Sequence, residues 1–149
     1  MGCDIHLHVE RKFFGDVWAT LKAPHDLLHP DRQGRSGERY RAPGYYQWYL
    51  GRNYELFSSL ADVRNDGGID PLAMNPGIPD DASEVTQELN SYWGMDGHTP
   101  GWYDAHWLRD EAEWPKPLEE IDGEFKGMLD VLVKLGPPGT VRIVFWFDN

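Results

Sequence analysis

Cysteine is nearly absent from this chain of 149 residues, which contains only Cys3. A single cysteine excludes an intramolecular disulfide, so the fold cannot depend on the cross-links that stabilise many small secreted domains. No apolar run approaches the roughly 20 residues that a membrane-spanning helix needs, and the first residues do not form a signal peptide. We therefore expect a soluble, cytoplasmic protein that has no membrane partner and relies on its own hydrophobic core.

Positive charge is also scarce. The sequence has 14 lysine and arginine residues against 25 aspartate and glutamate residues, which gives a formal net charge of −11 at pH 7. Binding to duplex nucleic acid depends on many cations that neutralise phosphates, so this composition argues against it. A small anionic ligand is compatible with it, because several basic residues fall within one region: Arg32, Arg35, Arg39, Arg41 and Arg52.

The sequence shows no internal repeat, low-complexity tract or linker, and its length suits a single domain, residues 1–149. Apolar alternation predicts a hairpin of strands at 3–12 and 16–22, and a nearly continuous apolar run predicts a central strand at 140–148. Apolar periodicity and capping residues predict helices near 54–63, 83–93, 104–112 and 123–135. These elements indicate an α+β fold: a mostly antiparallel sheet with helices packed on one face, and a long irregular loop at 23–51.

The opening strand carries the clearest chemical pattern. Ile5, Leu7 and Val9 alternate with polar residues, and successive side chains of a strand point to opposite faces. One face would therefore be apolar, and the other would present a polar row: Asp4, His6, His8 and Glu10. Such groups can bind a metal or transfer protons, although an antiparallel strand with one solvated face has the same pattern.

A second candidate group, Asp96 and His98, follows the predicted helix at 83–93. Functional side chains are commonly presented by loops and helix ends, but Asp96-Gly97 could also be a simple turn capped by His98. If this group meets the opening strand, the combined site would have four catalytic candidates: His6, His98, Asp4 and Asp96. Imidazole and carboxylate groups also suit Zn or Mn, with Asp4, His6 and His98 as the ligands.

The irregular segment at 23–51 combines arginines with aromatic residues. Guanidinium groups bind phosphate oxygens in pairs, and aromatic rings stack on bases, so this composition is typical of a nucleotide pocket. The ligand-binding candidates are Arg39, Arg41, Arg52, Trp48 and Tyr54. A solvated loop that is anchored to the core by its aromatic rings would have a similar composition.

Several short motifs are spread over the whole length: Met1-Gly2-Cys3-Asp4-Ile5-His6, Arg52-Asn53-Tyr54, Pro79-Asp80-Asp81, Asp96-Gly97-His98 and Phe147-Asp148-Asn149. On these motifs the chain resembles a family of short phage and bacterial proteins that open with Met-Gly-Cys-Asp-Ile-His. The resemblance implies that His8 is less important than the other polar candidates: Asp4, His6, Glu10, Asp96 and His98. It also implies an anti-defence role, because small phage proteins include some that bind or destroy the nucleotide signals of bacterial immunity.

The segment Asp4-Ile5-His6-Leu7-His8 also resembles the first-strand metal motif of amidohydrolases, but 149 residues are too few to build the barrel of those enzymes. Three functions therefore stay open. The first is a hydrolase that cleaves a phosphodiester or related bond of a linear or cyclic nucleotide, with or without Zn or Mn. The second is a non-catalytic protein, acting as a homo-oligomer, that sequesters such a nucleotide. The third is an acidic structural or protein-inhibiting phage protein.

Overall fold

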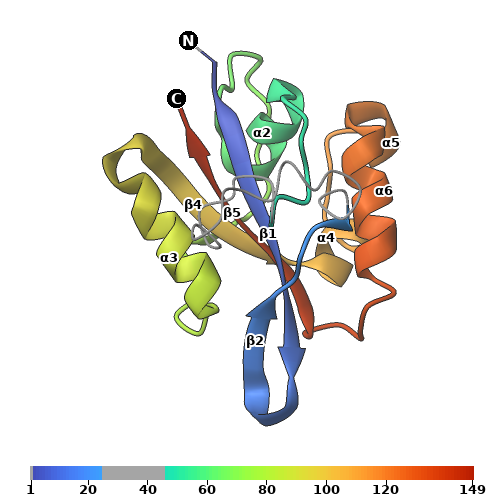
Figure 1. Cartoon of the computed structure of the whole chain (residues 1–149). Coiled ribbons are helices and arrows are strands. Elements are labelled where there is room, and N and C mark those ends of the chain that lie inside the picture. Colours follow the sequence, from blue (N-terminus) through green and yellow to red (C-terminus); the bar gives the residue numbers. More distant parts are fainter. Residues whose placement is uncertain (1, 25–45) are drawn as a thin grey trace.

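A five-stranded sheet forms the centre of the computed structural model, which describes residues 2–24 and 46–149 (Figure 1). The strand order is β2-β1-β5-β4-β3, and every neighbouring pair is antiparallel. The strands are β1 (Asp4–Phe13), β2 (Val17–Thr20), β3 (Asn75–Pro76), β4 (Gly97–Asp104) and β5 (Val141–Asp148). The helices are α2 (Tyr54–Ala61), α3 (Glu84–Trp93), α4 (Ala105–Asp110), α5 (Leu118–Ile121) and α6 (Gly123–Leu132). The predicted α+β fold with its antiparallel sheet is thereby confirmed.

The first and last strands of the chain lie side by side at the middle of the sheet (Figure 1). β5 is buried along its length except at Asp148, as its continuous apolar sequence predicts for a central strand. Its register with β1 runs from Asp4 opposite Asp148 to Arg11 opposite Val141. Residues at the two ends of the sequence therefore meet on one sheet, next to both chain termini.

One face of the sheet carries the main core. Ile5, Leu7 and Val9 point to this face, where α2, α4, α5 and α6 cover them. The helices contribute apolar side chains that include Leu56, Phe57 and Leu60 from α2, Leu108 from α4, and Phe125, Leu129 and Leu132 from α6. Capping agrees with the sequence, because Asn53 and Asp122 accept hydrogen bonds from backbone N–H groups in the first turns of α2 and α6.

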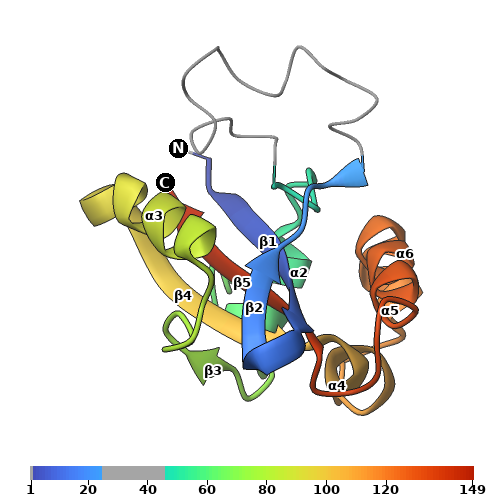
Figure 2. The same cartoon turned by 60° about the horizontal axis from the view of Figure 1, so that its bottom comes forward.

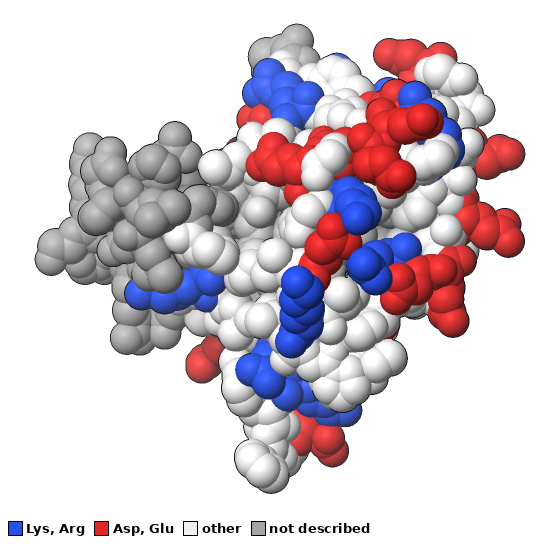
Figure 3. All heavy atoms as spheres, turned by 90° about the vertical axis from the view of Figure 1, so that its right-hand side faces the viewer, with Lys and Arg blue, Asp and Glu red and all other residues white. Residues whose placement is uncertain are grey.

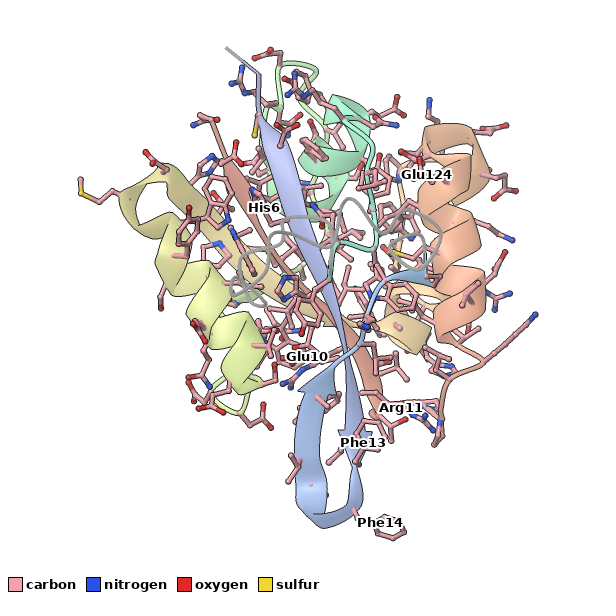
Figure 4. All side chains as sticks on the ribbon, viewed as in Figure 1. His6, Glu10, Arg11, Phe13, Phe14 and Glu124 are labelled. Atoms are coloured by element: carbon pink, nitrogen blue, oxygen red, sulfur yellow. The ribbon has the colours of Figure 1, made fainter. Side chains whose placement is uncertain are left out.

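Helix α3 packs against the opposite face, which carries the polar side chains of β1. Ser83 caps this helix, and its backbone N–H also donates to Glu10 Oε2 at 2.8 Å. Figure 4 shows the side chain of His6 on the α3 side of β1. Because α3 covers this face, His8 and Glu10 are buried. The polar row is thus largely enclosed and does not form a solvated strand surface.

Strand β4 lies in a segment for which the sequence predicts a loop. Glycine, proline and threonine hide any alternation there, and Thr99 adopts a left-handed backbone conformation with φ of 50°. The strand forms nevertheless because β5 supplies hydrogen-bond partners, with an irregularity in register between His98 and Gly101. Figure 2 shows the short strand β3 beside β4 at the edge of the sheet.

Within residues 2–24 and 46–149, the longest apolar helices are too short or too polar to cross a bilayer. Two of the predicted phosphate-binding residues, Arg39 and Arg41, lie outside these described ranges. Trp48, Arg52 and Tyr54 lie within them.

Candidate acid–base site

A histidine and a carboxylate meet where β1 and β5 end. His6 pairs in register with Trp146, and Asp148 lies two residues further along β5, on the same face. His6 Nε2 donates to Asp148 Oδ2 at 2.5 Å. Their side chains are 16% and 17% exposed, so the pair is shielded but still reached by solvent. A charge-assisted bond of this length orients the imidazole and selects its tautomer.

Two tryptophan rings flank the imidazole of His6. The Trp93 ring, from the last residue of α3, lies 4.3 Å from the His6 ring between centroids. The Trp146 ring lies 5.7 Å away and is nearly parallel, at 17°. Trp146 is fully buried, and its Nε1 has no hydrogen-bond partner in the described part of the chain. The site therefore combines a polar pair with aromatic walls and one unsatisfied N–H donor.

Gly97 allows these two tryptophans to approach the site. A Cβ atom at this position would lie 3.2 Å from Trp93 Cβ and 3.5 Å from Trp146 Cδ1. Gly97 pairs with Asp148 in the sheet, so the backbone of β4 passes directly beside the carboxylate. A side chain at this position would require Trp93 to shift by a few tenths of an ångström.

Asp4 and Arg52 form a second ion pair at the rim. Arg52 Nε and Nη2 donate to the two carboxylate oxygens of Asp4 at 2.8 and 2.9 Å. The hydrogen bond from Arg52 lowers the pKa of Asp4. A Cβ on Gly2 would collide with the Arg52 guanidinium, so the glycine of the opening motif leaves room for this pair. Arg52 was predicted to bind phosphate, and in this structure it binds a carboxylate.

His8 joins β1 to α3. Its Nδ1 lies 3.0 Å from Thr86 Oγ1, within a buried hydrogen bond. Burial, followed by the nearby charge of His6, lowers the pKa of His8 to about 3. His8 is therefore neutral at ordinary pH and acts as a structural contact between β1 and α3.

Glu10 also has a structural role. Its Oε1 accepts from Arg142 Nε at 2.8 Å, and a second guanidinium nitrogen, Nη1, binds Asp81 Oδ1 at 2.9 Å. The Arg142 guanidinium carbon lies 3.7 Å from the centroid of the Trp18 ring. The polar row of β1 thus divides into an accessible end at Asp4 and His6 and a buried end at His8 and Glu10.

The second predicted group lies elsewhere. His98 pairs with Phe147 in register and stacks on its ring, so it points to the sheet face opposite to His6. Its Nδ1 lies 2.9 Å from Thr99 Oγ1, and its Nε2 has no partner among the described residues. Asp96 is exposed in the 3-10 turn Gly94–Asp96 before β4. The structure therefore brings Asp4 and His6 together with Asp148, and separates His98 from them by the sheet.

The remaining predicted ligand-binding residues hold the chain in place. Trp48 Nε1 donates to the backbone oxygen of Leu21 at 3.0 Å. The Tyr54 hydroxyl accepts from the backbone N–H of Cys3 at 3.0 Å, close to Asp4. Of these two aromatic residues, Tyr54 is the one that adjoins the acid–base site.

A metal centre would need more ligands than the site provides. Across residues 2–24 and 46–149, no group of three or more His, Cys, Asp and Glu side chains is arranged to hold a metal ion. The predicted set of Asp4, His6 and His98 is split between the two faces of the sheet. Among the described residues the predicted ligands thus do not converge on one point, and a Zn or Mn site stays a prediction through which we derive no chemical step.

Sequence reasoning missed Asp148, Trp146 and Trp93 as site residues. Asp148 carried a usable signal, because it is a charged residue that directly follows a buried strand and shares the face of Trp146. The sequence alone predicts core positions for the two tryptophans.

Comparisons with models of protein families, with curated proteins and with solved structures found no match to this chain.

Proposed function

We propose that the chain is a small hydrolase that cleaves a phosphodiester or related bond of a nucleotide, with His6 and Asp148 as its acid–base pair. The observation that carries this proposal is the 2.5 Å bond between His6 Nε2 and Asp148 Oδ2 at a shielded but accessible position. A positioned acid or base of this kind contributes a factor of about 10²–10⁴ to a rate. A purely structural His–Asp bond is the competing explanation, and the variants below separate the two.

The proposal gives each ring nitrogen of His6 a separate role. Asp148 accepts the proton-bearing Nε2, so the neutral imidazole has its lone pair on Nδ1. Among the described residues, Nδ1 makes no hydrogen bond. In the proposed reaction, Nδ1 removes a proton from water as its oxygen forms a bond to phosphorus. The bond from phosphorus to the leaving oxygen then breaks, and the imidazolium, held by Asp148, returns the proton to that oxygen.

The surroundings of His6 favour a nucleotide as substrate. Trp93 is partly exposed beside His6 and offers a ring on which a base can stack. Arg52 supplies positive charge at the rim, oriented by Asp4. Arg39 and Arg41 stay predictions as further phosphate ligands.

The resemblance to phage proteins narrows the proposal further. It favours a linear or cyclic nucleotide signal of bacterial immunity as the substrate, and action in the cytoplasm of the host cell as an anti-defence protein. A second candidate is a protein that binds such a nucleotide without cleaving it. The partly exposed Trp93 ring beside His6 supports this alternative as well, because a base can stack on it whether or not cleavage follows.

The test is turnover on a panel of linear and cyclic dinucleotides and ADP-ribose derivatives, with EDTA and with added Mn or Zn as parallel conditions. His6→Gln and Asp148→Asn keep the shapes of the side chains but remove the acid–base pair. Each should lower turnover by about 10²–10⁴ while leaving the fold intact. His106→Gln is the matched control. His106 lies on α4, away from the site, and its side chain binds the backbone oxygen of Gly136.

The outcomes separate the candidates. If the parent cleaves a nucleotide and both site variants lose activity while the control keeps it, the acid–base role is supported. If the parent binds a nucleotide but never cleaves it, the sequestering function replaces the hydrolase. If His6→Gln retains full activity, the His6–Asp148 pair is structural.

A further inference from the structure

The tip of the β1–β2 hairpin exposes apolar side chains to solvent. The conformation of the turn does not require apolar residues at these positions. Phe14 is 101% exposed, and Phe13 and Val17 are also exposed. The turn itself is made by Gly15 and Asp16 with positive φ, so it places no demand on an aromatic residue at position 14. Figure 4 shows Phe13 and Phe14 at the far end of the hairpin, which projects away from the rest of the molecule. Clustered apolar residues of this kind mark interaction sites.

The hairpin also carries positive charge on an acidic protein. The Arg11 guanidinium lies 5.2 Å from the centroid of the Phe13 ring, and it has no ion pair with a described residue. Lys12 is paired with Asp16. The register of β1 with β5 ends at Arg11, and the Lys12 N–H still donates to the backbone oxygen of Thr140 just before β5. Beyond it, Phe13 pairs with Val17 of β2. The tip is thus a convex surface that combines apolar groups with one uncompensated cation.

A groove with complementary properties lies beside α4, α5 and α6. It has a volume of about 510 Å³, and Trp114, Pro117 and Leu118 provide apolar walls. Its three cations are already neutralised within the chain, because Arg109 and Lys126 bind Asp130, and Lys116 binds Glu55. Glu113 and Glu119 also line the groove, and they form no ion pair with residues in the described ranges. The groove therefore has apolar walls, three cations that are paired within the chain, and two carboxylates that can receive a cation from outside.

We propose that the hairpin tip of one copy of the chain docks into the α4–α6 groove of a second copy. Phe14 enters the apolar part of the groove, and Arg11 faces Glu113 and Glu119. Figure 3 shows charged side chains of both signs over α5 and α6, and uncharged atoms at the end of the hairpin that projects below them. The β1–β2 hairpin and the helices that line the groove lie on different parts of the molecule (Figure 1), so each copy uses both surfaces. Such a head-to-tail contact closes into a ring or continues as a chain of copies.

Sedimentation equilibrium of the full chain over a concentration series tests this contact. The parent should associate in a concentration-dependent way. Phe14→Asp should weaken association by at least about tenfold, because it replaces the central apolar anchor by a charge of the wrong sign. The matched control is Met95→Asp, since Met95 is 102% exposed on a different surface and its replacement should leave association unchanged. Circular dichroism verifies that each variant is folded.

Mixing two defective variants distinguishes this contact from a symmetric one. Phe14→Asp has a defective tip and an intact groove, whereas the double variant Glu113→Lys, Glu119→Lys has an intact tip and a defective groove. Each alone should be monomeric, and an equimolar mixture should form a dimer with one intact contact. The double variant should also associate with Arg11→Glu, in which the charge of the tip is reversed. A monomeric parent at every concentration, or a mixture that fails to associate, overturns the proposal.

Discussion

Glu10 should be one of the residues on which the stability of the sheet depends most strongly. Its carboxylate is 0% exposed and Arg142 is 4% exposed, so the ion pair between them is almost completely removed from water. Arg142 Nε and Nη2 lie 2.8 and 2.7 Å from Glu10 Oε1, and Ser83 N–H donates to Oε2. The carboxylate thereby connects β1, β5 and the start of α3.

Replacing Glu10 by Leu leaves the Arg142 guanidinium buried, with Asp81 as its one remaining ion-pair partner among the described residues. Breaking one side of a buried pair costs about 3–5 kcal/mol. Because Asp81 continues to bind Arg142 Nη1, we expect the lower end, about 3 kcal/mol. For a domain of this size, that corresponds to a fall in Tm of about 6–12 °C.

The double variant Glu10→Leu, Arg142→Met should recover part of this loss. It removes both charges together, so no uncompensated charge is left inside the protein. We expect a coupling free energy of at least about 2 kcal/mol between the two positions. Asp4→Asn is the matched control, since the Asp4–Arg52 pair has similar bond lengths but side chains that are 50% and 51% exposed. Its loss should cost less than about 1 kcal/mol.

Urea unfolding at neutral pH, followed by tryptophan fluorescence, measures all of these free energies. The slope of the unfolding free energy against urea concentration should be unchanged, which shows that the variants unfold as the parent does. A loss below about 1 kcal/mol for Glu10→Leu would refute the reasoning. Strictly additive single losses would refute it as well, because they would show that the two charges do not depend on each other.

Two further predictions concern His8 and Asp122. Because burial lowers the pKa of His8 to about 3, the unfolded chain binds a proton that the folded chain does not, and stability should fall as the pH drops below the unfolded value. Between pH 7 and pH 5 the loss of unfolding free energy due to His8 should be about 2 kcal/mol, which urea unfolding can measure. The loss should be absent from His8→Gln, so equal pH dependence of stability in both proteins would contradict the prediction. Asp122→Ala removes the cap of α6 and the acceptor of the Tyr49 hydroxyl, and should cost about 2–3 kcal/mol in unfolding free energy. A loss below about 0.5 kcal/mol, the range of ordinary surface changes, would contradict that assignment.

The sequence by itself determined the local features of this protein. The alternation of Ile5, Leu7 and Val9 with polar residues predicts which face of β1 meets the core, because side-chain direction in a strand depends only on parity. Asp104 and Asp122 predict helix starts because a side-chain oxygen can satisfy free N–H groups within three residues. The continuous apolar run at 141–147 predicts a central strand, because a strand covered on both faces is apolar at every position. All of these predictions are confirmed.

The tertiary structure alone decided which polar residues meet. Asp148 is 142 residues from His6, and only the antiparallel register of β1 with β5 brings their side chains together. Strand β4 has no alternation of its own and forms because β5 offers it partners, and this pairing turns His98 to the opposite face from His6. The burial of His8 and Glu10 likewise follows from α3, which packs on a face that alternation alone predicts to be solvated. Side-chain parity is a local property, whereas strand order, register and the cover over each face depend on contacts between distant parts of the chain.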